Sequence, residues 1–233
     1  MRFAAIETST EWCSIALWDA GESIALEERA GVRHGELALP MLEALFARAG
    51  YGMQALDAIV FGAGPGAFTG LRVACGLAQG LAFARGLPVL GVSTLEAVAE
   101  ESGASRVLVA LDARMQEVYC AALEKQDGVW REAVAAACLP PEAVEVPPGE
   151  GWLGAGSGFA AYGERMAAGL RASLLRIAPE IRPGATAIAR LAAPRLAAGE
   201  GVDAGLAMPL YIRDKVALTS IEQAGLRAQP RVQ

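Results

Sequence analysis

Histidine and cysteine are scarce in this sequence. His34 is the only histidine among 233 residues, and four cysteines, Cys13, Cys75, Cys120 and Cys138, form no Cys-x-x-Cys pair. Because zinc and iron sites need several such ligands at close spacing, and a Ser-His-acid triad would have to use His34, we expect neither kind of enzyme. The sequence therefore predicts no metal site, reduced cysteines in the core, and a structural or contact role for His34.

Long apolar runs and a basic surface are also missing. No apolar run reaches the length of about 18 residues that marks a membrane-spanning helix, and Glu7 lies where the apolar core of a signal peptide would be. The net charge of −6 disfavours direct binding to nucleic-acid phosphates. We expect a cytoplasmic protein with no membrane contact and, at most, an indirect role with nucleic acid.

Glycine is abundant between Gly62 and Gly86. This stretch follows an apolar strand candidate, and the order strand, glycine-rich turn, helix is typical of a phosphate-binding loop whose first helical turn Thr69 could cap. The lysine that ends a Walker loop is absent after Thr69, so any site should be weak and bind free nucleotide poorly. The predicted weak nucleotide or anion loop consists of Thr8, Ser9, Gly64, Gly66 and Thr69.

Two predicted helices carry apolar residues on more than one side. The first, from Gly35 to Ala49, is expected to use Leu39, Leu42 and Leu45 as its core face, and the helix after the glycine loop is apolar nearly all round. Such helices are covered on both sides, and the pattern leaves open whether the protein's own fold or a partner does this. The residues predicted for a partner surface are Leu37, Met41, Ala44, Arg48, Arg72, Cys75, Gly76, Gln79 and Phe83.

The order of elements repeats along the chain. Three short strands followed by alternating helices and strands are expected in residues 1–103, and again from residue 104 onward, with one helix from Phe159 to Leu170. This doubling predicts an α/β protein of two tandem domains, 1–103 and 104–233, as in the actin-like (ASKHA, ribonuclease H-like) fold. Within the tail 200–233, which could pack back on the first domain, residues 208–213 are expected to be extended and those past Ala224 frayed.

An actin-like small-molecule kinase or ATPase is the alternative that this fold suggests. Such an enzyme needs acidic groups for Mg²⁺ and a base for the acceptor hydroxyl, and Glu7 and Asp112, each at a strand end, are the best candidates. A simpler interpretation of Asp112 is a turn in which it pairs with Arg114.

Five motifs resemble the TsaB family, also called YeaZ. They are Ile6-Glu7-Thr8-Ser9-Thr10, Arg33-His34-Gly35-Glu36, Gly64-Pro65-Gly66-Ala67-Phe68-Thr69-Gly70-Leu71-Arg72, Asp112-Ala113-Arg114 with Glu117-Val118-Tyr119, and Pro209-Leu210-Tyr211-Ile212-Arg213. The resemblance implies a two-domain actin-like fold and no catalysis by the chain alone. It implies a partner role beside TsaD, which transfers the threonylcarbamoyl group to an adenosine next to the anticodon of ANN-decoding tRNAs, and beside the ATPase TsaE. It leaves open a homodimer, and ATP or ADP at an interface of the assembled complex; no cofactor of the chain's own is expected.

Overall fold

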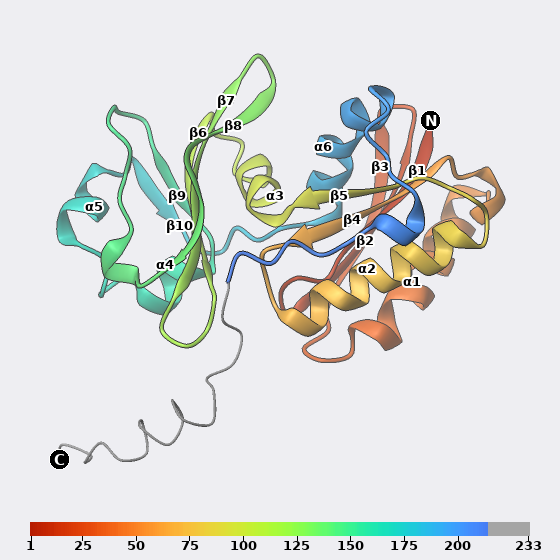
Figure 1. Ribbon diagram of the computed structural model, residues 1–233, viewed down its shortest axis with the longest axis horizontal. Coiled ribbons are helices and arrows are strands. Elements are labelled where there is room, and N and C mark those ends of the chain that lie inside the picture. Colours follow the sequence, from red (N-terminus) through yellow and green to blue (C-terminus); the bar gives the residue numbers. More distant parts are fainter. Residues whose placement is uncertain (214–233) are drawn as a thin grey trace, which may run out of the picture.

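The computed structural model describes residues 1–213, in which two lobes lie side by side (Figure 1). The first sheet contains β1 (Arg2–Glu7), β2 (Trp12–Asp19), β3 (Glu22–Arg29), β4 (Ala58–Gly64) and β5 (Val89–Ser93). The second contains β6 (Arg106–Asp112), β7 (Val118–Gln126), β8 (Val129–Leu139), β9 (Leu153–Ala155) and β10 (Arg176–Ala178).

The two sheets have the same topology. The first has the order β3-β2-β1-β4-β5, and the second, read from its other edge, has the order β8-β7-β6-β9-β10. In each, the first three strands pair antiparallel and the last two join in parallel. This repeat confirms the predicted doubling and is the actin-like (ASKHA) architecture.

Helices cover both faces of the first sheet. The α-helices are α1 (His34–Ala49), α2 (Phe68–Phe83), α3 (Thr94–Glu101), α4 (Ser157–Tyr162), α5 (Ala168–Ser173) and α6 (Ala185–Ala197), and short 3₁₀ turns are η1 (Met53–Ala55), η2 (Pro141–Ala143) and η3 (Ala204–Leu206). Residues of α1 and α2 form one apolar core with the sheet, and α6 forms a second core on the opposite face. Although α6 follows β10 in the chain, it thus packs on the first sheet.

Helix α3 joins the lobes. Its residues Leu95, Val98 and Ala99 share a core with the second sheet, while α4 and α5 contribute to the core on that sheet's other face. Ser93 caps α3 by accepting a hydrogen bond from the Glu96 backbone N–H at 3.4 Å, as the sequence predicts.

Three sequence-based expectations are wrong. The helix expected from Phe159 to Leu170 is two short helices, α4 and α5, because the chain turns at Gly163. Leu39, expected in the core, is 42% exposed, whereas Met41, expected on a partner surface, is 8% exposed and belongs to the core. The face of α1 that contacts the sheet is thus rotated from the expected one. Residues past Ala224, expected to be frayed, lie outside the described residues.

Candidate functional site

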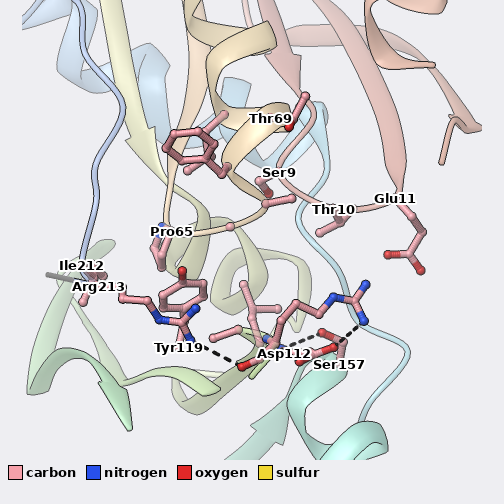
Figure 2. A pocket seen from close by; sticks show the side chains of 18 of the residues that line it. Ser9, Thr10, Glu11, Pro65, Thr69, Asp112, Tyr119, Ser157, Ile212 and Arg213 are labelled. Carbon is pink, nitrogen blue, oxygen red and sulfur yellow. Dashed lines mark hydrogen bonds and ion pairs between the residues drawn. The ribbon is translucent and has the colours of Figure 1, made fainter. Parts of the chain in front are cut away.

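A cavity of about 480 Å³ lies where the two lobes meet. Its walls come from the β1–β2 turn, the β3–α1 loop, the glycine loop with the first turn of α2, the β6–β7 turn and the segment Leu210–Arg213. Figure 2 shows Ser9 and Thr69 on one side of this space, and Tyr119, Asp112 and Ser157 on the other. All five motifs quoted above thus contribute residues to this one cavity.

The glycine loop is packed against the protein's own backbone. A side chain at Gly66 would lie 2.6 Å from the Ser9 Cβ atom, and one at Gly70 would overlap the Thr8 carbonyl oxygen. The Ala67 N–H donates to the Ser9 carbonyl at 2.8 Å, and the Thr8 hydroxyl donates to the Gly70 carbonyl at 2.8 Å. Gly66 and Gly70 are therefore accounted for by close contact with the Thr8–Ser9 backbone, and the Ala67 N–H is already used within the protein.

Two further details differ from the predicted anion loop. Gly64, at φ +119°, faces the Leu210 carbonyl oxygen, which would lie 2.7 Å from an added Cβ. The N-cap of α2 is Ala67, so Thr69 lies inside the first turn and does not cap the helix. Close packing accounts for Gly64 and Gly66, while the first turn of α2, with its partial positive charge, lines the cavity.

Glu7 lies inside the first lobe and not on the cavity wall. Its side chain is fully buried, Oε1 accepts the Ser9 N–H at 2.6 Å, and Oε2 fills the space where a side chain at Gly62 would be. Burial raises the pKa of Glu7 to about 6, an effect that the hydroxyl and N–H of Ser9 partly oppose. Glu7 thus does not face the cavity where the kinase hypothesis needs an acid.

Asp112 lines the cavity but is engaged by neighbours. Its carboxylate pairs with Arg114 Nη1 at 2.9 Å and accepts hydrogen bonds from the Arg114 N–H at 2.7 Å and the Tyr162 hydroxyl at 3.0 Å. This is the turn with a salt-bridging arginine that the simpler interpretation predicts. Among residues 1–213, no three His, Cys, Asp or Glu side chains are grouped so that they could hold a metal ion.

His34 is the first residue of α1 and is 4% exposed in the cavity wall. Burial lowers its pKa, and a hydrogen bond with the Thr10 backbone partly opposes this. Its Nδ1 atom has no hydrogen-bond partner among the described residues. His34 is thus a buried residue at the start of α1, with its side chain in the cavity wall.

The predicted partner surface on α1 and α2 is only partly exposed. Ala44 and Arg48 of α1 and Arg72, Gly76 and Phe83 of α2 are exposed, and Phe83 reaches 82%. Leu37 and Gln79 are half-buried, whereas Met41 and Cys75 lie in the core of the first lobe. The expectation of a free apolar face is therefore wrong for Met41 and Cys75.

The chain itself covers part of α2. The Ala207 carbonyl accepts hydrogen bonds from Gln79 Nε2 at 3.0 Å and from Cys75 Sγ at 3.4 Å, and Arg72 Nε donates to the Tyr211 hydroxyl at 3.1 Å. Figure 1 shows this blue segment running beside α2 toward the second lobe. The sequence predicts that the tail could pack back on the first domain, and residues 204–211 do so. The particular bonds to the Ala207 carbonyl were not predicted, since hydrogen bonds to a backbone carbonyl leave no pattern in the sequence.

The same segment ends in an ion pair that sequence reasoning missed. Arg213 Nη2 donates to Glu117 Oε2 in the second lobe, joining two of the motifs quoted for the family resemblance. The only signal in the sequence was that Arg213 and Glu117 each belong to one of the quoted motifs.

Among the described residues, no helix is long and apolar enough to cross a membrane.

Comparisons with known proteins show which family the sequence resembles. A family model described as TsaD, tRNA N6-adenosine threonylcarbamoyltransferase, matches residues 27–220. The chain is 38% identical over 227 residues to the Escherichia coli tRNA threonylcarbamoyladenosine biosynthesis protein TsaB, covering 93% of this chain and 96% of that protein. The protein of the same name from Haemophilus influenzae is 35% identical over 225 residues, 91% of this chain and 93% of its own length.

A solved structure extends the comparison to three dimensions. YeaZ from Pseudomonas aeruginosa aligns with a TM-score of 0.84 and 44% sequence identity, covering 90% of this chain and 99% of that one. Near-complete coverage on both sides means that the likeness extends through both lobes. The chain therefore belongs to the TsaB (YeaZ) family of tRNA threonylcarbamoyladenosine biosynthesis proteins.

Proposed function

We propose that the chain is the non-catalytic partner of TsaD in forming threonylcarbamoyl-adenosine in tRNA, within an assembly that also includes the ATPase TsaE. The observation that carries the proposal is the 38% identity with E. coli TsaB over almost the whole of both chains. The net charge of −6 supports a role in which tRNA is met through the complex and not by this chain alone.

The glycine loop supports the absence of catalysis by the isolated chain. Phosphoryl transfer depends on backbone N–H groups and cations that surround the phosphates. Here the loop packs closely on Ser9, the Ala67 N–H is bonded to the Ser9 carbonyl, and Glu7 is buried away from the cavity. A nucleotide would thus bind only weakly to the free chain, and ATP or ADP is better placed at an interface of the complex.

The proposed contact surface for TsaD lies on α1 and α2. Ala44, Arg48, Gly76 and Phe83 are its exposed members, with Arg72, Gln79 and Leu37 beside them. A Cβ atom at Gly76 would meet nothing within 4 Å among the described residues, so the backbone there is open to close approach by a partner. Met41 and Cys75 support this surface from below, because they pack in the core under it. The same surface could serve a homodimer of the free chain.

Depletion of the protein tests the proposed function directly. We expect threonylcarbamoyl-adenosine, measured by nucleoside mass spectrometry of bulk tRNA, to fall in a depleted strain and to return when the chain is supplied again. In vitro, purified TsaD and TsaE with the threonylcarbamoyl donor should modify tRNA only when this chain is added. Intact modification after depletion, or modification by this chain without TsaD, would show that the proposed role is wrong.

A further inference from the structure

The C-terminal strap, residues 204–213, connects the surface of α2 to the second lobe. It is anchored on α2 at two places, where Gln79 Nε2 donates to the Ala207 carbonyl at 3.0 Å and Arg72 Nε donates to the Tyr211 hydroxyl at 3.1 Å. Between them, the Leu210 N–H donates to the Ala63 carbonyl at 2.7 Å. Figure 1 shows the strap leaving α2 and reaching toward β6 and β7. The strap therefore links α2 to the other lobe through a short length of chain.

The far end of the strap is Arg213, whose side chain is 14% exposed. Its Nη2 atom donates to Glu117 Oε2 and, at 3.4 Å, to the Arg114 carbonyl, and its guanidinium lies 5.8 Å from the centre of the Tyr119 ring. Charge-assisted hydrogen bonds of this kind are among the stronger polar contacts in proteins. Arg213 therefore attaches the strap to both ends of the β6–β7 turn.

That turn has an unfavourable backbone. Arg114, Met115 and Gln116 have φ values of 61°, 51° and 65°, three successive left-handed residues without a glycine among them. Side chains disfavour this region, so such a conformation persists only where surrounding contacts hold it. Within the turn, the Arg114 N–H donates to Asp112 Oδ1 at 2.7 Å and the Glu117 N–H donates to the Arg114 carbonyl at 3.0 Å. From outside it, Arg165 Nη1 donates to Gln116 Oε1 at 3.3 Å, and Arg213 donates to the Arg114 carbonyl and to Glu117. The turn is thus an element that can relax once a contact is lost.

We propose that Arg213 is a latch by which the strap couples the surface of α2 to the β6–β7 turn. While the strap lies on α2, Arg213 holds the turn in its left-handed conformation against the interdomain cavity. When the strap leaves α2, Arg213 leaves Glu117 and the turn relaxes, which changes the wall of the cavity. The device acts within this chain and does not require the proposed role beside TsaD.

Hydrogen exchange of the full-length chain, followed by mass spectrometry, tests the latch. Two backbone bonds report on the turn, from the Ala113 N–H to the Glu117 carbonyl and from the Glu117 N–H to the Arg114 carbonyl, both at 3.0 Å. We expect Arg213→Ala to speed exchange of the peptide covering this turn roughly tenfold, the effect of losing about one charge-assisted hydrogen bond. Arg213→Lys keeps a charge beside Glu117 and should retain most of the protection.

Coupling along the strap is tested from its other end. Gln79→Ala removes an anchor on α2 without touching the turn, and we expect it to speed exchange of the same peptide several-fold. In the double variant Gln79→Ala/Arg213→Ala, the peptide covering the turn should exchange no faster than in Arg213→Ala alone, because Arg213 no longer holds the turn in either protein. The matched control is Arg182→Ala, which breaks a two-bond contact with Glu27, both bonds at 2.9 Å, away from the strap. It should leave the turn unchanged.

The outcomes separate the two parts of the inference. An unchanged turn in Arg213→Ala would show that Arg213 is not a latch. A turn that responds to Arg213→Ala but not to Gln79→Ala would show that the strap does not transmit from α2, which also overturns the proposal. Exchange of peptides from β1 and β4 should stay at the parent rate in every variant, which verifies that each one folds.

Discussion

Replacing Glu7 by glutamine should remove a pH-dependent cost from the folded state. The folded-state pKa is about 6 against an ordinary value of 4.5, and each pKa unit corresponds to about 1.4 kcal/mol, so ionised Glu7 costs the fold about 2 kcal/mol above both values. The folded protein thus binds this proton more tightly than the unfolded chain does. The contribution of Glu7 to stability therefore decreases as pH rises from about 4.5 to 6 and stays low above that range.

Urea unfolding at several pH values measures this effect. The free energy of unfolding of Glu7→Gln minus that of the parent should be roughly 1.5 kcal/mol larger at pH 7 than at pH 4.5. A change in packing that does not depend on pH contributes equally at both pH values and cancels in this comparison. Glutamine retains an oxygen that can accept the Ser9 N–H, which limits that change. Glu11→Gln, on the exposed part of the same turn, is the control for replacing a carboxylate by an amide there. A relative stability that is the same at both pH values would refute the reasoning.

The remaining predictions concern glycines and nucleotide binding. Gly80→Ala should raise the free energy of unfolding by about 1 kcal/mol, measured by urea unfolding, because the position is inside α2 and no described atom lies within 4 Å of the added methyl. Gly70→Ala should lower it by at least about 2 kcal/mol in the same assay, since the methyl would overlap the Thr8 carbonyl; an unchanged value would show that the loop is not tightly packed. Calorimetry of the isolated chain with ATP should give a dissociation constant above about 10 μM, which corresponds to a binding free energy weaker than about −7 kcal/mol. Tighter binding would contradict the interpretation of the glycine loop as packed on its own backbone.

Most of the strands and helices could be predicted, because each leaves a recognisable pattern in its own stretch of the sequence. Short runs rich in apolar residues mark β1 to β3 and β6 to β8, and Gly50 ends α1 in a left-handed conformation, as a glycine cap does. The packing side of α6 could not be predicted, since a short, alanine-rich helix suits either sheet. The chain order suggested the second lobe, but the helix packs on the first.

The candidate site was harder to predict than the fold. The glycine loop has the composition of a phosphate loop, yet Gly66 and Gly70 are needed for contact with Thr8 and Ser9, and sequence alone does not distinguish a ligand from a neighbouring turn. Met41 and Cys75 were assigned to a partner surface because projection on an ideal helix does not say which apolar side meets the sheet. Packing of the tail on the first domain was expected, but its contact with Gln79 and Cys75 was not, because the acceptor is the backbone carbonyl of Ala207, an alanine without a polar side chain.

Binding of this chain to TsaD, compared between two glycine-to-tryptophan variants, tests the central claim most directly. Gly76 in α2 and Gly169 in α5 are both exposed helical glycines with no described atom within 4 Å of an added Cβ. After circular dichroism has shown that both variants fold, sedimentation with purified TsaD should show Gly76→Trp weakened by roughly 2–4 kcal/mol and Gly169→Trp unchanged. Equal, parent-like binding of both variants would contradict the account and place the TsaD contact away from Gly76.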